Sequence, residues 1–282
     1  MNFRKSFVLL VLVLAACAPT RRETLRIVFS PAPGIDSATA IAAYGGVIAE
    51  LEEKLGVDVE MQTTTEYAAV VEALANGTAD MARLGGMPYI QAHEQIGVEP
   101  LVREINPEGI AECHGIIIGR PGIWDEPFTF NQLKGKTMAF PDIGSTSGYL
   151  SNVVNMKENG IELDDLAEYG FLGSHPAVLE AVVAGSVDAG GTNDWRTNLA
   201  VSQGAGVPGE DFVILATTPP IPMNCWGVRA DMDSRLKERV RNALLSLSDE
   251  AFAGCDQVKG FVPGADSDYD YVRVLMEEGL VE

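Results

Sequence analysis

Basic residues are scarce in this sequence. Its 282 residues contain 20 Lys+Arg against 40 Asp+Glu, which gives a formal net charge of −20 and a pI near 4.4. A nucleic-acid partner requires a basic stripe that neutralises its phosphates, and an anionic membrane surface requires a polybasic patch. The shortage of positive charge therefore argues against nucleic acid as a partner and against purely electrostatic attachment to a membrane.

Residues that commonly hold metals or perform catalysis are also few. The three histidines show no metal-site spacing, and the four cysteines include no Cys-x-x-Cys pair. Residues 135–137, Gly-Lys-Thr, lack the earlier glycine of a phosphate-binding P-loop, and residues 144–148, Gly-Ser-Thr-Ser-Gly, have threonine where a nucleophile elbow has serine. With no acid–base–nucleophile set, the sequence predicts a protein that is not an enzyme and that holds neither a metal nor a cofactor.

Long apolar runs are missing, apart from one near the amino terminus. There an Arg-Lys pair precedes an apolar run over residues 7–14, which is too short to cross about 30 Å of hydrocarbon. The following Leu-Ala-Ala-Cys, ending at Cys17, resembles a bacterial lipobox. We expect residues 1–16 to be a signal peptide and residues 17–24 a tether lipidated at Cys17, on the periplasmic or extracytoplasmic face of a membrane. The alternative is a secreted protein in which Cys17 occurs by chance.

Short apolar runs alternate with helical patterns through the mature chain. This rhythm is typical of an α/β protein in which helices cover mostly parallel sheets. The expected strands cover residues 25–30, 57–62, 80–84, 137–140, 168–172, 187–191, 212–216 and 224–229. The expected helices cover residues 37–55, 66–75, 148–159, 176–184, 193–203, 233–248 and 268–278, and a proline-rich crossover covers residues 219–222.

One helix–turn–strand unit occurs twice. Residues 67–80, YAAVVEALANGTAD, align without gaps on residues 175–188, HPAVLEAVVAGSVD, with six of the fourteen positions identical at an offset of 108. Two copies so far apart predict two similar lobes, although helix–glycine–strand units resemble one another in any α/β protein. Because open sheets bind ligands beyond the carboxyl ends of their strands, we expect Tyr67 and His175, which begin the two copies, to face one cleft.

Residues 141–149, PDIGSTSGY, join an expected strand to an expected helix. The hydroxyls of Ser145, Thr146 and Ser147 and the free amides of the first helical turn are hydrogen-bond donors, and the helix dipole adds partial positive charge. Together they predict an anion site that uses no cationic side chain. The alternative is an ordinary helix cap, which needs only one of these hydroxyls.

Several motifs in combination resemble those of a known family. They are Asp-x-x-Ser-Thr-Ser-Gly-Tyr-Leu over residues 142–150, Gly-Ser-His ending at His175, Ala-Val-x-x-Gly-x-Val-Asp over residues 181–188 and Thr-Pro-Pro-Ile-Pro over residues 218–222. Nearly the whole mature chain resembles the phosphonate/phosphite-binding family of ABC-transporter substrate-binding lipoproteins. The resemblance implies a two-lobed, type II periplasmic-binding-protein fold whose lobes are joined by two crossover strands.

The resemblance also implies where the lobes and the ligand lie. Lobe I comprises residues 25–112 and 223–282, and lobe II comprises residues 113–222, each a mostly parallel sheet flanked by helices. The residues that the resemblance places around the ligand's oxyanion are Ser145, Thr146, Ser147, His175 and Tyr67.

Two departures from the family's pattern bear on the ligand. Cys113 stands where members often have tyrosine at the start of the first crossover strand, and Asn224-Cys225 stands where they often have Asp-Pro. Without a carboxylate at these places, an ammonium-bearing phosphonate loses its counter-charge. We therefore expect Cys113 and Asn224 to line a cleft that takes a phosphonate with an uncharged tail, phosphite, phosphate or a related oxyanion.

Three cysteines besides Cys17 remain in the mature chain, in an oxidising compartment. Cys113, Cys225 and Cys255 allow one disulfide and one free thiol. A bond between Cys113 and Cys225, which the resemblance puts on two crossover strands, and a bond between Cys225 and Cys255 across the helix 233–248 are the candidates. The alternative is a thiol that lines the cleft, which suits a thiophilic ligand such as arsenite.

The expected function is that of a substrate-binding lipoprotein that captures a small phosphorus oxyanion between its lobes and delivers it to an ABC permease. The expected partners are the oxyanion, the permease and the lipid anchor, and the protein is expected to be a monomer. Two alternatives stay open: a periplasmic sensor of a thiophilic oxyanion such as arsenite, coupled to a histidine kinase, and an enzyme on the same fold. The lipid anchor and the missing catalytic set argue against the enzyme.

Overall fold

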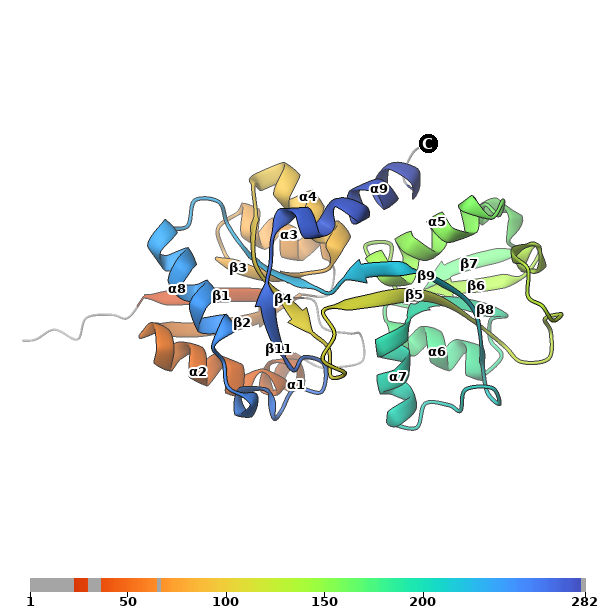
Figure 1. Ribbon diagram of the computed structural model, residues 1–282, viewed down its shortest axis with the longest axis horizontal. Coiled ribbons are helices and arrows are strands. Elements are labelled where there is room, and N and C mark those ends of the chain that lie inside the picture. Colours follow the sequence, from red (N-terminus) through yellow and green to blue (C-terminus); the bar gives the residue numbers. More distant parts are fainter. Residues whose placement is uncertain (1–22, 30–36, 65–66, 280–282) are drawn as a thin grey trace, which may run out of the picture.

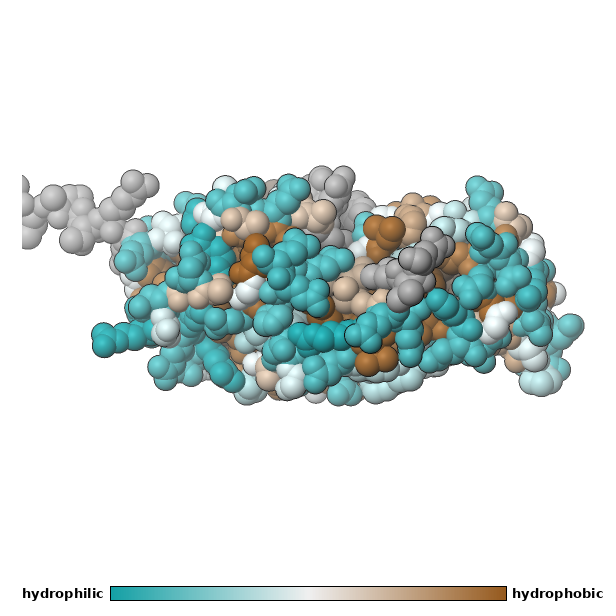
Figure 2. Space-filling model, turned by 90° about the horizontal axis from the view of Figure 1, so that it is seen from above, coloured by the Kyte–Doolittle hydropathy of each residue, from teal (hydrophilic) through white to brown (hydrophobic). Residues whose placement is uncertain are grey.

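The structure is a computed structural model that describes residues 23–29, 37–64 and 67–279 of the chain. Figure 1 shows two α/β lobes side by side, each built on its own sheet, which confirms the expected architecture. The face of the molecule in Figure 2 is largely hydrophilic. The expected signal peptide and the lipidation site Cys17 lie outside the described residues. Within the described ranges, no helix is both long enough and apolar enough to cross a membrane.

The first sheet has six strands in the order β11-β4-β10-β3-β1-β2. β1 pairs in parallel with β2 and β3, whereas β10 runs antiparallel to β3 and β4, and β11 runs antiparallel to β4. The sheet is therefore mixed, so the expectation of a mostly parallel sheet is wrong, because the chain returns through β10 and β11 antiparallel to their neighbours. Its strands are β1 (Thr24–Phe29), β2 (Asp58–Thr63), β3 (Met81–Leu84), β4 (Glu99–Ile105), β10 (Cys225–Val228) and β11 (Gly260–Pro263).

The second sheet has five strands in the order β7-β6-β8-β5-β9. β6 is parallel to β7 and β8, whereas β5 is antiparallel to β8 and β9. In Figure 1, β5 and β9 are the strands of this sheet that extend toward the first lobe. The strands are β5 (Glu112–Gly119), β6 (Thr137–Phe140), β7 (Glu168–Phe171), β8 (Ala189–Asn193) and β9 (Val213–Pro222).

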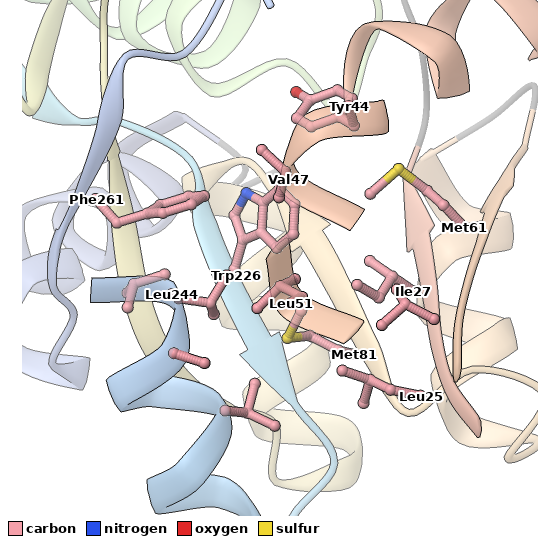
Figure 3. Close-up of a cluster of buried hydrophobic side chains, with 14 of the residues drawn as sticks. Leu25, Ile27, Tyr44, Val47, Leu51, Met61, Met81, Trp226, Leu244 and Phe261 are labelled. Carbon is pink, nitrogen blue, oxygen red and sulfur yellow. The ribbon is translucent and has the colours of Figure 1, made fainter. Parts of the chain in front are cut away.

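Helices cover both faces of the first sheet because its strands are apolar on both sides. The consecutive residues Ile27 and Val28 of β1 enter two different core clusters, since neighbouring side chains of a strand point to opposite faces. Figure 3 shows the cluster around Trp226, which includes Leu51 of α2 and Leu244 of α8. The α-helices are α1 (Ser37–Ala43), α2 (Gly45–Leu55), α3 (Tyr67–Ala75), α4 (Gly86–Ile96), α5 (Ser151–Glu158), α6 (His175–Val183), α7 (Asp194–Ser202), α8 (Ser234–Leu245) and α9 (Asp270–Gly279).

The internal repeat has the same hydrogen bonds in both copies. The carboxylate of Asp80 accepts from the backbone N–H of Arg26 at 3.0 Å, and the backbone N–H of Asp80 donates to the carbonyl of Arg26 at 2.9 Å. In the second lobe, Asp188 exchanges the same two bonds with Thr137, each at 3.1 Å. The aspartate that ends each copy thus fixes the repeated unit to the neighbouring strand.

Three local predictions differ from the structure. The single helix expected over residues 37–55 is broken at Tyr44 into α1 and α2, where the two consecutive glycines Gly45 and Gly46 are poor helix formers. The helix expected from residue 148 begins instead with a π-helical turn, η2 (Thr146–Leu150), before α5. The proline-rich crossover is part of β9, an edge strand in which prolines need not donate to a neighbour.

The carboxyl-terminal helix α9 packs against both lobes. Val272 and Leu275 of α9 share a buried apolar cluster with Ile90 of α4 in the first lobe and with Leu150 and Val154 of the second lobe. At the end of α9, the ammonium of a lysine on α5 donates to the carbonyl of Glu278 at 2.9 Å. The apolar core on one face of the first sheet therefore continues into the second lobe.

Candidate functional site

A cavity of about 120 Å³ lies where the two lobes meet. The first lobe contributes the amino-terminal end of α4, at Gly85 and Gly86, and the second lobe contributes the loop before η2. The segment between β9 and β10 closes a third side. The polar residues that line the cavity include Arg83, Asp142, Ser145, Thr146, Ser147, Ser174, His175, Asn193, Arg196 and Asn224.

Side-chain hydrogen bonds fix the conformation of the loop before η2 and of the first turn that follows it. Asp142 Oδ1 accepts from the N–H of Gly144 at 2.6 Å, and Ser145 Oγ caps the helix by accepting from the N–H of Gly148 at 3.0 Å. Ser147 Oγ accepts from the side-chain amide of Asn193 at 2.9 Å. Each serine oxygen is thus oriented by one donor, which leaves the hydroxyl hydrogen to donate elsewhere. The helix-cap interpretation is right for Ser145, and the other two hydroxyls have different partners.

Thr146 connects the two lobes across the cavity. Its Oγ1 accepts from the backbone N–H of Met87, in the first turn of α4, at 2.8 Å in a buried position. The absence of a side chain at Gly86 permits this close approach of the two lobes. An added Cβ would lie 3.4 Å from the Thr146 methyl and 3.0 Å from Val272. Two helix amino termini, each with amides that lack acceptors inside the helix, therefore face the same small space.

His175 begins α6, which is capped by Ser174 Oγ accepting from the N–H of Ala177 at 3.1 Å. Nδ1 of His175 lies 3.0 Å from Thr192 Oγ1, and Thr197 Oγ1 donates to Thr192 Oγ1 at 3.5 Å. Because Thr192 Oγ1 accepts this hydrogen bond from Thr197, its own hydroxyl hydrogen is free to donate to Nδ1 of His175. The neutral imidazole then carries its hydrogen on Nε2, the nitrogen not engaged by Thr192.

The charge of His175 follows from its surroundings. Burial, and secondarily the positive charge of Arg196, lowers the pKa of His175 to about 3. The imidazole is therefore neutral near pH 7. It also rests on Gly148, where an added Cβ would lie 2.9 Å from His175 Cε1 and 2.4 Å from Pro141.

The depressed pKa of His175 predicts a loss of stability in acid. Between pH 7 and pH 5 the unfolded chain binds a proton at His175 and the folded chain does not, so the free energy of unfolding falls as the pH falls. Relative to a His175→Gln variant, the wild type should lose about 2 kcal/mol over this interval. Urea unfolding of both proteins at the two pH values measures the difference, in which the titration of the carboxylates cancels. Equal losses in the two proteins would contradict the prediction.

A buried ion pair lies behind the first lobe's side of the cavity. Glu104, on β4, is fully buried and accepts from Arg83 Nε at 2.5 Å and from Arg83 Nη2 at 2.8 Å. The same carboxylate accepts from Asn224 Nδ2 and Trp226 Nε1, each at 2.9 Å. Since a carboxylate only accepts, Asn224 must direct its NH₂ group at Glu104, and its Oδ1 lies beside Gly85 at the cavity.

The cysteines are free thiols in the structure, so neither candidate disulfide is formed. Cys225 and Cys255 pack in separate core clusters, which keeps that pair apart, and Cys113 lies on β5. Burial raises the pKa of the Cys113 and Cys225 thiols, which opposes formation of thiolates. Of these three cysteines only Cys113 lines the cavity, so they do not gather into a set of thiols for arsenite.

The structure brings most of the predicted site residues together. The members that line the cavity are Cys113, Ser145, Thr146, Ser147, His175 and Asn224. Tyr67 begins α3 as the repeat predicts, but its side chain lies outside the described residues. In the part of the chain that the structure describes, no cluster of three or more His, Cys, Asp or Glu side chains is arranged to hold a metal ion.

The contributions of α4, Thr192, Asn193 and Arg196 are absent from the sequence predictions. A usable signal was available, because the repeat offset of 108 continues beyond residue 188. It places the start of α4 at Gly86 opposite the start of α7 at Asp194. Their N-cap residues, Gly85 and Asn193, correspond as well, and both line the cavity.

A two-lobed α/β fold with a small cavity of hydrogen-bond donors at the junction defines a substrate-binding protein. Residues 29–269 match the family described as the phosphonate periplasmic substrate-binding protein of ABC transporters, and the chain belongs to this family. The family's description as a substrate-binding protein of a transporter agrees with the expected transport role.

Relatives and solved structures agree with the assignment. The chain is 29% identical to the phosphate-import protein PhnD of Mycolicibacterium smegmatis, over 89% of this chain and 84% of that protein. It is 25% identical to the probable phosphite-binding protein PhnD1 of Prochlorococcus marinus, over 70% of this chain and 68% of that protein. The solved structure of PhnD1 from Prochlorococcus marinus with methylphosphonate has a TM-score of 0.77 and 19% identity, covering 91% of this chain and 98% of that one. This likeness confirms the expected type II fold.

Proposed function

We propose that this protein captures a small phosphorus oxyanion in the cavity between its lobes and passes it to an ABC permease. The ligand class is a phosphonate without an ammonium group, phosphite or phosphate. The observation that carries the proposal is the convergence of Thr146, Ser147 and the neutral His175 on one small cavity at a helix amino terminus. These groups donate hydrogen bonds to anionic oxygens, and their burial strengthens each bond.

The size and charge of the cavity limit the ligand. An apolar cavity of about 150 Å³ holds benzene, so a cavity of about 120 Å³ suits a group no larger than methylphosphonate. Glu104 pairs with Arg83, so that arginine adds little net charge to the cavity. Asn224 Oδ1 is an acceptor, which favours an oxyanion that keeps one P–OH group and donates from it. The names of the relatives, which refer to phosphate, phosphite and methylphosphonate, support the same class.

The membrane arrangement is part of the proposal. Cys17 carries the lipid, and the tether holds the two lobes at the extracytoplasmic face, next to the permease, as a monomer. Two or more acyl chains give stable anchoring, which one chain does not. Growth with radioactive palmitate tests the anchor: the wild type should be labelled and a Cys17→Ala variant should not.

Isothermal titration calorimetry of the purified chain tests the ligand class. We expect saturable binding of methylphosphonate, phosphite or phosphate, and at least tenfold weaker binding of 2-aminoethylphosphonate and sulfate. Sulfate is the informative control because it has the same shape but is fully deprotonated near pH 7, so it has no hydrogen to donate to Asn224. Binding of none of the three phosphorus oxyanions would refute the proposal.

A further inference from the structure

A second cavity adjoins the first. It has a volume of about 430 Å³ and shares three lining residues, Arg83, Pro176 and Arg196, with the cavity of about 120 Å³. Its walls come from both lobes, with Ala40 and Tyr44 on one side and Leu199 and Ala200 of α7 on the other. The oxyanion cavity therefore has a neighbour, with two arginines on their common wall, that is large enough for an organic group.

Tyr44 is a buried donor without a partner at this cavity. Its side chain is only 4% exposed, and its ring packs edge-on against Phe29 with centroids 5.4 Å apart and against Trp226 at 5.8 Å. Its hydroxyl is buried and makes no hydrogen bond in the structure. Figure 3 shows this hydroxyl turned away from the core around Trp226. A buried hydroxyl without a partner is costly, which is a reason to expect a ligand atom there.

The charges around the second cavity favour an acceptor. Arg83 and Arg196 line it, whereas Asp256 is its one lining carboxylate among the described residues. Asp256 is exposed at the rim, where it accepts from Gln203 Nε2 at 3.0 Å. Arg196 lies flat against Trp195, 4.2 Å from the ring centroid, which fixes its direction. Because Arg83 is already paired with Glu104, the guanidinium of Arg196 and the phenol of Tyr44 form the donor set for a carboxylate or carbonyl oxygen.

We infer that the second cavity receives the organic substituent of a phosphonate, and that Tyr44 donates a hydrogen bond to a carboxylate at the end of that substituent. The inference rests on the proposed function, because the phosphonate head must occupy the first cavity. It extends the ligand class from small oxyanions to carboxyalkyl phosphonates. It also explains why a site for so small an anion has a large chamber beside it.

Calorimetry with a matched pair of ligands tests this inference. 3-Phosphonopropionate and propylphosphonate have the same carbon chain and differ in a carboxylate against a methyl group. We expect the wild type to bind 3-phosphonopropionate about tenfold more tightly, and Tyr44→Phe to remove most of that preference, because one hydrogen bond to a charged group is lost. Methylphosphonate does not reach Tyr44, so its affinity should change less than twofold.

A Tyr271→Phe variant is the matched control. Tyr271 lies on α9 and is 36% exposed, so the same change there should leave the preference intact. Equal affinities of the wild type for the two ligands, or an unchanged preference in Tyr44→Phe, would overturn the inference and leave the proposed function standing. Failure of methylphosphonate, phosphite and phosphate to bind would instead refute the proposed function itself.

Discussion

Replacing Thr146 with valine is expected to weaken binding of the oxyanion by about 3 kcal/mol, roughly 100-fold in Kd. Valine keeps the shape of threonine but loses Oγ1, which accepts from the N–H of Met87 at 2.8 Å. The variant therefore loses a donor to the ligand and also leaves a buried N–H of the other lobe without a partner. Calorimetry with whichever phosphorus oxyanion binds the wild type measures the effect.

Thr146→Ser is the control for this prediction. Serine keeps the hydroxyl and loses only a methyl group, which packs near Gly86. We expect its affinity to stay within about tenfold of the wild type. Equal weakening in the serine and valine variants would show that the methyl, rather than the hydroxyl, matters at this position.

Replacing Glu104 with alanine is expected to lower the free energy of unfolding by about 4 kcal/mol. The change leaves the guanidinium of Arg83 without its partner in a position where that side chain is only 10% exposed. It also removes the acceptor of Asn224 and of the indole N–H of Trp226. Urea denaturation without ligand measures the loss, and the unfolding slope should stay constant.

A double variant tests whether the unpaired charge of Arg83 causes the loss. In Arg83→Met with Glu104→Gln the unpaired charge is gone, and the glutamine oxygen still accepts from Trp226. The expected loss is about 1 to 2 kcal/mol, well below that of Glu104→Ala alone. If the double variant is as unstable as Glu104→Ala, the intact ion pair itself stabilises this side of the cavity, and the unpaired charge is not the cause of the loss.

Local patterns were sufficient for the predictions about the second lobe's site. Ser145, Thr146 and Ser147 lie in the short loop and turn that follow the apolar strand β6, and the Ser-His-Pro signature marks the start of α6. Both features arise from neighbouring residues, so they are visible in a single sequence. The repeat added the relation between α3 and α6 because it preserves an aspartate that bonds the backbone of the adjacent strand in both lobes.

Long-range pairing explains what the sequence analysis did not find. β4 carries Pro100 and three charged residues, which hide a strand, but its Glu104 is buried because Arg83 of β3 neutralises it. α4 begins with Gly-Met-Pro, which is a weak helix signal in the sequence. The glycine is needed there because the helix approaches Thr146 of the other lobe closely. β11 is four residues long and contains glycine and proline. The partners of each element lie far away in the chain, so composition within the element is misleading.

The position of α9 has a consequence for transport. A hinge motion that moves the lobes apart at this helix parts Val272 and Leu275 from α4 or from Leu150 and Val154, and so exposes apolar surface to water. The apolar contact of α9 with both lobes therefore favours the closed form even when no ligand is bound. If only the open form admits the ligand, the apparent affinity is reduced in proportion to the fraction of ligand-free protein that is open. Shortening this helix should therefore speed both loading and unloading.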